Sequence, residues 1–289
     1  MGFEIKNNDS ERREYWMRML DKADAFMQAV TDYPVKECRE PMVSLEEAAR
    51  AEKVEVVFSD LPHMHGLSRL FYLRTGLIGQ FLAVAREMNE RGWMLKVEEG
   101  YRTMEMQKSL LNRNIFSAIL CRVQWECGCY RPQVDLLYRR IGALVALSPK
   151  LGTHMSGSAM DVSVLLRDTG GELDRGGRYL EMSELTPMDS PFIAEQSGKN
   201  RREITGIMHK HGFVDYPFEF WHYNDGDAYS EYLNNTRRPA RYGAVHMNSL
   251  DGSVTPIENP VAPLISTDVI REMMDQILAE QPEKARRTI

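Results

Sequence analysis

The sequence predicts a globular chain that mixes helices with strands, because two kinds of apolar spacing occur along its 289 residues. Apolar residues three or four positions apart, the spacing of a helix with one buried face, occur over 9–30, 73–91 and 267–280. Residues 93–98 alternate between apolar and polar, which is typical of a strand. Asp251-Gly252, between two short apolar runs, indicates a hairpin turn. At this length the chain can bury a sizeable core.

The remaining elements follow in order without an internal repeat. Tyr33-Pro34 ends the first helix, and Gly92 ends the second, because a glycine allows the left-handed turn that stops a helix. Residues 104–145 are expected to be mostly helical, with a break around Cys127-Gly128-Cys129. We also expect a helix near 44–51, strands at 54–58 and 159–166, a helix at 205–211, and a hairpin formed by 244–250 and 253–257.

Composition excludes several classes of protein. A net charge of −6 and a pI near 5.7 argue against a nucleic-acid surface. No uncharged run of about 18 apolar residues is present, so we expect no membrane span. The first residues are polar and lack the apolar stretch of an export signal. We therefore expect a cytoplasmic protein whose few cysteines are reduced thiols: Cys38, Cys121, Cys127 and Cys129.

Two short segments carry residues suited to a metal site. The first contains His154 and Asp161 in the pattern His-x-x-Gly-x-Ala-x-Asp, and the second, about 60 residues later, reads Glu219-Phe220-Trp221-His222. Two histidines and one carboxylate leave a fourth position open for water, as catalytic zinc requires. A glutamate beside a ligating histidine suits a general base. Each residue alone is more often structural, but the joint pattern is specific.

The spacing of these residues constrains the local backbone. His154 and Asp161 are seven positions apart, so a straight strand would put them on opposite faces. Gly157 lies between them and allows the chain to turn. Glu219 and His222 are three positions apart, so a turn or bulge is expected there as well. On the strand that follows Gly157, the residues facing away from Asp161 are expected to enter a core: Met160, Val162 and Val164.

At these residues the sequence resembles the D-alanyl-D-alanine dipeptidases of the vancomycin-resistance type. They belong to a zinc peptidase group that includes D,D-carboxypeptidases and shares its fold with hedgehog domains. The resemblance covers about 70–225 and includes Phe71–Gly76, Glu99–Arg102 and Glu219–His222. It implies an α+β fold, in which a small antiparallel sheet bears the zinc site and helices pack on one face.

The resemblance also implies roles for individual residues. His154, Asp161 and His222 match the Zn²⁺ ligands, and Glu219 matches the base. Arg102 matches the arginine that stabilises the oxyanion, a role that a fixed guanidinium in a dry site fills well. Asp189, in Thr186-Pro187-Met188-Asp189, resembles an aspartate that binds the substrate's amino group, although a surface turn explains the segment equally well. Tyr101, beside Arg102, is the second expected substrate-binding residue.

The chain departs from the family at several positions. Gly152 stands where a serine is usual, Glu99 where an aspartate is common, and Thr103–Gln107 is closer to the carboxypeptidase branch. The flanks match nothing recognised. The expected organisation is therefore an N-terminal helical extension (1–60), a zinc peptidase domain (61–235), and a C-terminal hairpin and helix (236–289). The extensions are expected to wrap the core or to form an oligomer contact.

The expected function is zinc-dependent hydrolysis of a D-Ala-D-Ala-like dipeptide or a related cell-wall peptide. The alternatives are a D,D-carboxypeptidase acting on longer peptidoglycan peptides and a non-catalytic zinc-binding module. The expected partner is a small peptide substrate, and neither nucleic acid nor membrane is expected. Two other metal-binding patterns are weaker, because neither has a complete ligand set: His63-Met64-His65, and Cys121 with Cys127 and Cys129. The sequence leaves the oligomeric state open.

Overall fold

The computed structural model describes residues 9–280. The opening segment (1–8), on which the expected absence of an export signal rests, lies outside the described residues. The helices are α1 (Asp9–Thr31), α2 (Leu45–Ala51), α3 (Ile78–Glu90), α4 (Met104–Ser109), α5 (Arg113–Cys127), α6 (Val134–Leu144), α7 (Glu195–Lys210), α8 (Ala228–Leu233) and α9 (Thr267–Glu280). The strands are β1 (Met42–Ser44), β2 (Val56–Phe58), β3 (Tyr72–Arg74), β4 (Trp93–Glu99), β5 (Ala159–Leu166), β6 (Val214–Asp215), β7 (His222–Asn224), β8 (Val245–Met247) and β9 (Val254–Pro256).

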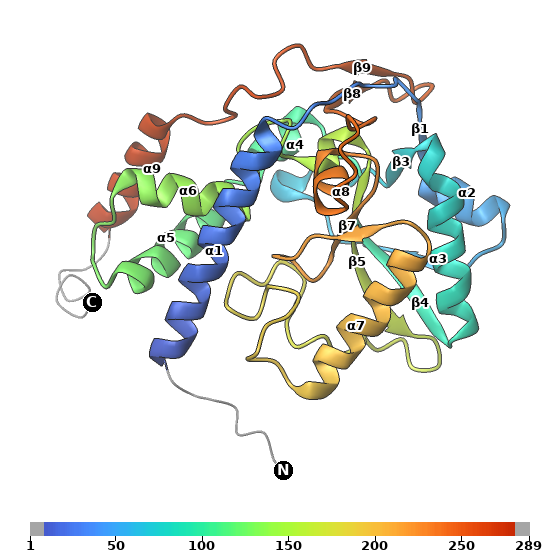
Figure 1. Ribbon diagram of the computed structural model, residues 1–289, viewed down its shortest axis with the longest axis horizontal. Coiled ribbons are helices and arrows are strands. Elements are labelled where there is room, and N and C mark those ends of the chain that lie inside the picture. Colours follow the sequence, from blue (N-terminus) through green and yellow to red (C-terminus); the bar gives the residue numbers. More distant parts are fainter. Residues whose placement is uncertain (1–8, 281–289) are drawn as a thin grey trace.

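A five-stranded sheet lies at the centre of the molecule, in the order β2-β4-β5-β7-β6. Its pairs are antiparallel except for β2 with β4, which run parallel, and helices surround it, so the α+β class is confirmed (Figure 1). The register places Glu99 opposite Asp161 and Asp161 opposite His222. Three polar residues from three neighbouring strands therefore lie in one row across the sheet.

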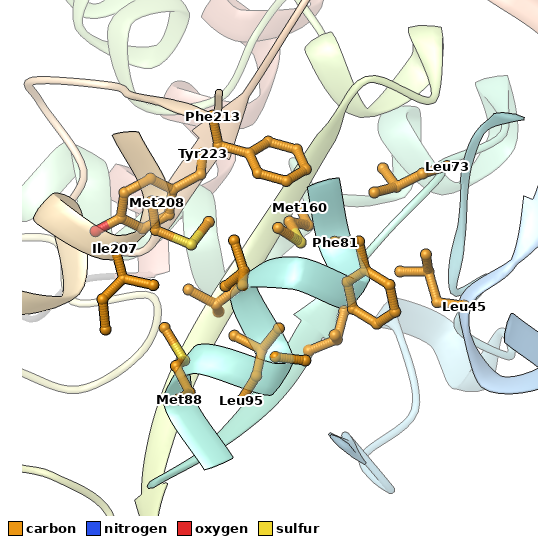
Figure 2. Close-up of a cluster of buried hydrophobic side chains, with 14 of the residues drawn as sticks. Leu45, Leu73, Phe81, Met88, Leu95, Met160, Ile207, Met208, Phe213 and Tyr223 are labelled. Atoms are coloured by element: carbon orange, nitrogen blue, oxygen red, sulfur yellow. The ribbon is translucent and has the colours of Figure 1, made fainter. Parts of the chain in front are cut away.

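One face of the sheet carries the main hydrophobic core. Met160, Val162 and Val164 of β5 are fully buried there, as their alternation with Asp161 predicts. Helices α3 and α7 cover this face and contribute Phe81, Met88, Ile207 and Met208, among others (Figure 2). Because successive residues of a strand point to opposite faces, this core directs Asp161 toward the other side.

A group of helices lies beside the sheet and joins the two ends of the described chain. Helix α1 packs against α5 and α6, and α9 packs against the same two helices (Figure 1). The buried apolar face of α9 is the one that its spacing predicts: Ile270, Met274, Ile277 and Leu278. Helices near both ends of the described residues thus pack on the same pair of helices. No helix within residues 9–280 is both long and apolar enough to span a membrane.

Three local expectations were wrong. Residues 72–74 form strand β3, paired with β1, and the long helix begins only at Ile78, after a 3-10 turn. Helix α7 begins at Glu195 instead of near residue 205. Cys127 and Cys129 are joined by a disulfide, because the left-handed Gly128 (φ 60°) ends α5 and brings the two side chains together. Cys38 and Cys121 are free and exposed.

Candidate metal centre

Gly157 makes the turn that brings His154 to Asp161. Residues Thr153–Ser156 form a 3-10 turn, and Gly157 ends it with a φ of 67°, in the left-handed region. A Cβ atom at this position would lie 2.5 Å from Cε of Met42. The expected break between His154 and Asp161 is therefore confirmed, and the left-handed backbone conformation favours glycine there.

His154, Asp161 and His222 converge in the interior. Their candidate ligand atoms all lie within 4.8 Å of one another, and all three side chains are buried. Oδ1 of Asp161 lies 3.2 Å from Nε2 of His154 and 2.9 Å from Nδ1 of His222. Zinc bonds of about 2.0–2.1 Å in a tetrahedral arrangement place ligand atoms roughly 3.3 Å apart. The spacing of the donor atoms therefore fits a metal ion of this size.

The second nitrogen of each histidine ring is held by a neighbouring group. Nδ1 of His154 lies 2.7 Å from the carbonyl oxygen of Gly100, which can only accept, so the proton belongs on Nδ1. Burial and the charge of Arg102 lower the pKa of His154, which favours the neutral ring. Its Nε2 lone pair then faces the Asp161 carboxylate, an arrangement that suits a cation between them. Nε2 of His222 lies 3.0 Å from the Thr153 hydroxyl, so both rings are oriented as metal ligands are.

The other oxygen of Asp161 has two partners of its own. Oδ2 accepts a hydrogen bond from the Tyr179 hydroxyl at 2.9 Å and one from Nη2 of Arg102 at 3.3 Å. Burial alone would raise the pKa of Asp161, but the two histidines hold it well below its ordinary value. The carboxylate is thus ionised and held in one orientation.

Glu219 lies in a turn that leads into β7. Its N–H donates to the carbonyl of Tyr216, and the N–H of His222 donates back to the carbonyl of Glu219. The strand begins only at His222, so the expected departure from a straight strand between Glu219 and His222 is confirmed. Burial, reinforced by the charge of Asp161, raises the pKa of Glu219 to about 7. A carboxylate with this pKa can accept and release a proton near neutral pH.

Arg102 follows β4 and is held beside the cluster by two carboxylates. Its Nε lies 3.3 Å from Oε2 of Glu99, and its Nη2 reaches Asp161. Glu99 also receives hydrogen bonds from Arg69 at 2.7 Å and from Nδ1 of His63 at 2.9 Å. Burial opposes ionisation of Glu99, but Arg102 and His63 lower its pKa to about 2. This network fixes the guanidinium at the site.

His63 has a structural role. One ring nitrogen contacts Glu99 and the other lies 3.0 Å from the carbonyl of Met106, while His65 is exposed. Within residues 9–280, the only cluster that could hold a metal ion is His154, Asp161 and His222. The weaker patterns at His63-Met64-His65 and at the cysteines form no such cluster among these residues.

A pocket opens at the cluster, between the sheet and helices α1, α5 and α6. Arg102, Glu219 and the three candidate ligands line one part of it, and mostly apolar side chains line the rest. The space open to the centre of a water-sized sphere is about 90 Å³. The pocket can therefore hold a small molecule beside both Glu219 and the candidate metal ligands.

The structure does not bring the two expected substrate-binding residues to this pocket. Asp189 is exposed, and it is not one of the lining residues. The hydroxyl of Tyr101 donates to the carbonyl of Val245 at 2.9 Å and accepts from the N–H of Met247 at 3.2 Å, so it fastens the C-terminal hairpin.

Sequence reasoning missed several groups that hold the ligands. Tyr179 and Thr153 contact Asp161 and His222 through hydroxyl groups, and no local pattern marks either residue. Gly100 lies within the segment Glu99–Arg102 that matches the family, and the structure gives a reason for the glycine. A Cβ there would lie 2.7 Å from the carbonyl oxygen of Leu70. Only glycine lets this strand end pass so close to its neighbour while its carbonyl orients His154.

The class of protein follows from this arrangement. Two histidines and a carboxylate that could hold a metal, with a second carboxylate of raised pKa and a fixed arginine at the wall of a pocket, are typical of a metallopeptidase site. A family model described as D-ala-D-ala dipeptidase matches residues 89–239, just over half of the chain. The chain therefore belongs to the D-ala-D-ala dipeptidase family.

Two D-alanyl-D-alanine dipeptidases are similar to the chain in sequence. The chain is 26% identical over 244 residues to a D-alanyl-D-alanine dipeptidase of Synechocystis, covering 73% of this chain and 94% of the relative. It is 27% identical over 155 residues to one of Enterococcus faecium, covering 50% of this chain and 69% of the relative. A solved structure of the LdcB LD-carboxypeptidase matches with 18% identity and a TM-score of 0.37, over 72% of this chain and 80% of that one.

Proposed function

We propose that the protein uses zinc to hydrolyse a D-Ala-D-Ala-like dipeptide or a related small peptide of cell-wall origin. The observation that carries this proposal is the convergence of His154, Asp161 and His222 on one point, beside a carboxylate with a pKa of about 7. The named activity of the relatives from Synechocystis and Enterococcus supports the substrate class.

His154, Asp161 and His222 would hold the metal. A zinc ion bound there supplies a Lewis acid for the scissile carbonyl and lowers the pKa of water. In the proposed reaction, Glu219 accepts a proton from the attacking water on its carboxylate. It then passes this proton to the leaving amine nitrogen. A pKa of Glu219 near the working pH favours both proton transfers.

Arg102 would stabilise the negative charge that develops on the carbonyl oxygen. Burial alone would lower the pKa of the guanidinium, but Glu99 and Asp161 raise it, so the group stays charged. Because its position is fixed before substrate binds, little reorganisation accompanies the reaction. Asp189 and Tyr101 as substrate-binding residues remain predictions.

A second candidate function is a D,D-carboxypeptidase acting on longer peptides. Gln107 ends the segment that is closer to the carboxypeptidase branch, and its buried side chain lines the pocket.

The cytoplasmic location expected from the sequence also remains a prediction. A free dipeptide would be the accessible substrate there. A non-catalytic zinc module would need neither Glu219 nor Arg102, yet both line the pocket.

The test is hydrolysis of D-Ala-D-Ala and of longer D,D-peptides by zinc-loaded protein, with and without a chelator. We expect turnover that the chelator abolishes, and a loss of 10²- to 10⁴-fold in a Glu219→Ala variant, typical of removing a general base. Glu105→Ala, a change at an exposed glutamate outside the pocket, serves as the control. Undiminished turnover in Glu219→Ala would exclude Glu219 as the base.

A further inference from the structure

The pocket beyond the candidate ligands is lined mostly by apolar side chains. We propose that the site selects peptides with a bulky apolar side chain, of leucine or phenylalanine size, next to the scissile bond, in preference to D-Ala-D-Ala. This inference rests on the hydrolysis proposed above and names the substrate class within it. It is carried by the lining, the charges and the volume of the pocket.

The apolar lining comes from five separate parts of the chain. These are helix α1, the residue that ends α4, the start of α5, the end of α6 and the loop before α7. The principal side chains are Met27, Leu110, Ile115, Leu144, Leu180 and Met182. A substrate group in contact with these side chains gains free energy by leaving water, in proportion to its apolar area.

The charged groups of the pocket are already paired with one another. Arg102 lies between two carboxylates, and Asp161 faces both histidines. Three buried polar atoms on the lining have no hydrogen-bond partner among the described residues: Nε of Arg102, the Tyr216 hydroxyl and Oε1 of Gln107. Nε of Arg102 lies 3.3 Å from Oε2 of Glu99, and the other two atoms belong to neutral groups. Apart from the base Glu219, the lining therefore offers no unpaired acid to a substrate ammonium group, and recognition falls to apolar contact and neutral hydrogen bonds.

Leu180 has a backbone conformation that points to function. Its φ of 63° lies in the left-handed region, which a leucine adopts only at a cost. The preceding residue, Tyr179, donates its hydroxyl hydrogen to Asp161, so the strained position lies directly beside the candidate metal ligands. Its side chain forms part of the pocket lining. The strained backbone thus presents an apolar wall next to the reacting centre.

The volume sets the size of the group that fits. The space open to the centre of a water-sized sphere is about 90 Å³, so the pocket can hold a substrate group of several non-hydrogen atoms beside the candidate ligands. A methylene in a hydrophobic pocket changes specificity by about 10- to 200-fold. We therefore expect at least a tenfold preference for the larger side chain.

The first experiment measures kcat/KM of zinc-loaded protein for D-Ala-D-Ala, D-Leu-D-Ala, D-Phe-D-Ala, D-Ala-D-Leu and D-Ala-D-Phe. We expect at least one bulky dipeptide to exceed D-Ala-D-Ala by tenfold or more. Equal or faster hydrolysis of D-Ala-D-Ala would overturn the inference and leave the proposed hydrolysis intact.

A second readout separates selection from catalysis. Calorimetry measures the affinity of zinc-free Glu219→Gln protein for the same dipeptides. We expect these affinities to show the same order of preference. If bulky dipeptides bind at least tenfold tighter but none is hydrolysed by the loaded enzyme, the selection stands and the proposed hydrolysis fails. If the bulky dipeptides bind no tighter than D-Ala-D-Ala, the selection fails.

Leu180→Gly tests the location of the selecting wall. Glycine tolerates the left-handed conformation, so this change removes the side chain without straining the fold. We expect the ratio of kcat/KM between the preferred bulky dipeptide and D-Ala-D-Ala to fall threefold to tenfold. Lys53→Gly, at an exposed left-handed residue outside the pocket, is the matched control and should leave the ratio unchanged. An unchanged ratio in Leu180→Gly would overturn the assignment of this wall.

Discussion

Asp161 is the residue on which the geometry of the candidate metal site depends. One carboxylate oxygen faces both histidines, and the other accepts hydrogen bonds from Tyr179 and Arg102. Four side chains therefore restrict its rotation before any metal binds. A ligand that is already oriented loses little conformational freedom on binding, so this arrangement favours metal affinity.

Tyr179→Phe should weaken metal binding. The change removes the hydroxyl hydrogen bond to Asp161 and leaves the ring in place, and loss of such a partner typically costs about 10- to 100-fold in metal affinity. Competition with a chromophoric zinc chelator measures the effect. Tyr232→Phe, at an exposed tyrosine, is the control. An affinity equal to that of the wild-type protein would show that Tyr179 does not support the ligand.

At this scale the sequence predicted the three candidate ligands, the base and the two turns that bring them together. These predictions were possible because the residues lie in short local patterns with restrictive spacing. Tyr179 and Thr153 could not be predicted, since each reaches its partner through tertiary structure. Asp189 and Tyr101 were expected at the substrate, and the structure places both outside the pocket lining.

Among the elements, the turn that carries Glu219 is held by two buried arginines. The guanidinium carbons of Arg201 and Arg175 lie 3.9 Å and 4.9 Å from the centre of the Phe220 ring. Arg201 also donates to backbone carbonyls of the loop before α7, including those of Leu185 and Pro187. The turn is thereby fastened to α7 and to the loop before it, and this fixes the position of Glu219 relative to β7.

Arg201→Lys should destabilise the protein by about 2–4 kcal/mol, because an ammonium group cannot replace the fork of donors and buried carbonyls lose their partners. Chemical denaturation of the zinc-free protein measures the free energy of unfolding. The neighbouring Arg202 is exposed, so Arg202→Lys is a matched control that should have little effect. Equal stability of the two variants would contradict this role for Arg201.

Prediction of the elements succeeded where local spacing alone determines the structure. The bounds of α9 agree with the predicted span of 267–280, because one apolar stripe runs along the whole helix. The first half of α7 was missed because its residues are mostly polar and include Gly198. Strand β3 was missed because its pairing with β1, about 30 residues away, overrides the helical spacing of its side chains.

At the scale of the whole molecule, the C-terminal hairpin is attached at the end of a central strand. Tyr101, two residues after β4, exchanges two hydrogen bonds with β8. The N–H of Met42 also donates to the carbonyl of Gly252 in the hairpin turn. The C-terminal hairpin is thus joined both to strand β1 and to the segment that carries Arg102.

Tyr101→Phe should loosen this hairpin while leaving turnover nearly unchanged. The variant loses two buried hydrogen bonds, worth about 1 kcal/mol each. Hydrogen exchange should therefore become faster in residues 245–256 and stay the same in 267–280, which serve as an internal control. A large rise in KM with unchanged exchange would instead support the substrate-binding role expected for Tyr101 from the sequence.

The pocket wall joins residues that are far apart in the sequence. The Tyr229 hydroxyl oxygen lies 2.8 Å from Sδ of Met27, and both residues line the pocket. These residues are 202 positions apart in the chain, and contacts at such separations form late because their loop-closure entropy is large. During synthesis, a ribosome-bound chain that lacks the segment around Tyr229 has no complete pocket. Peptidase activity would therefore arise only after most of the polypeptide has left the ribosome.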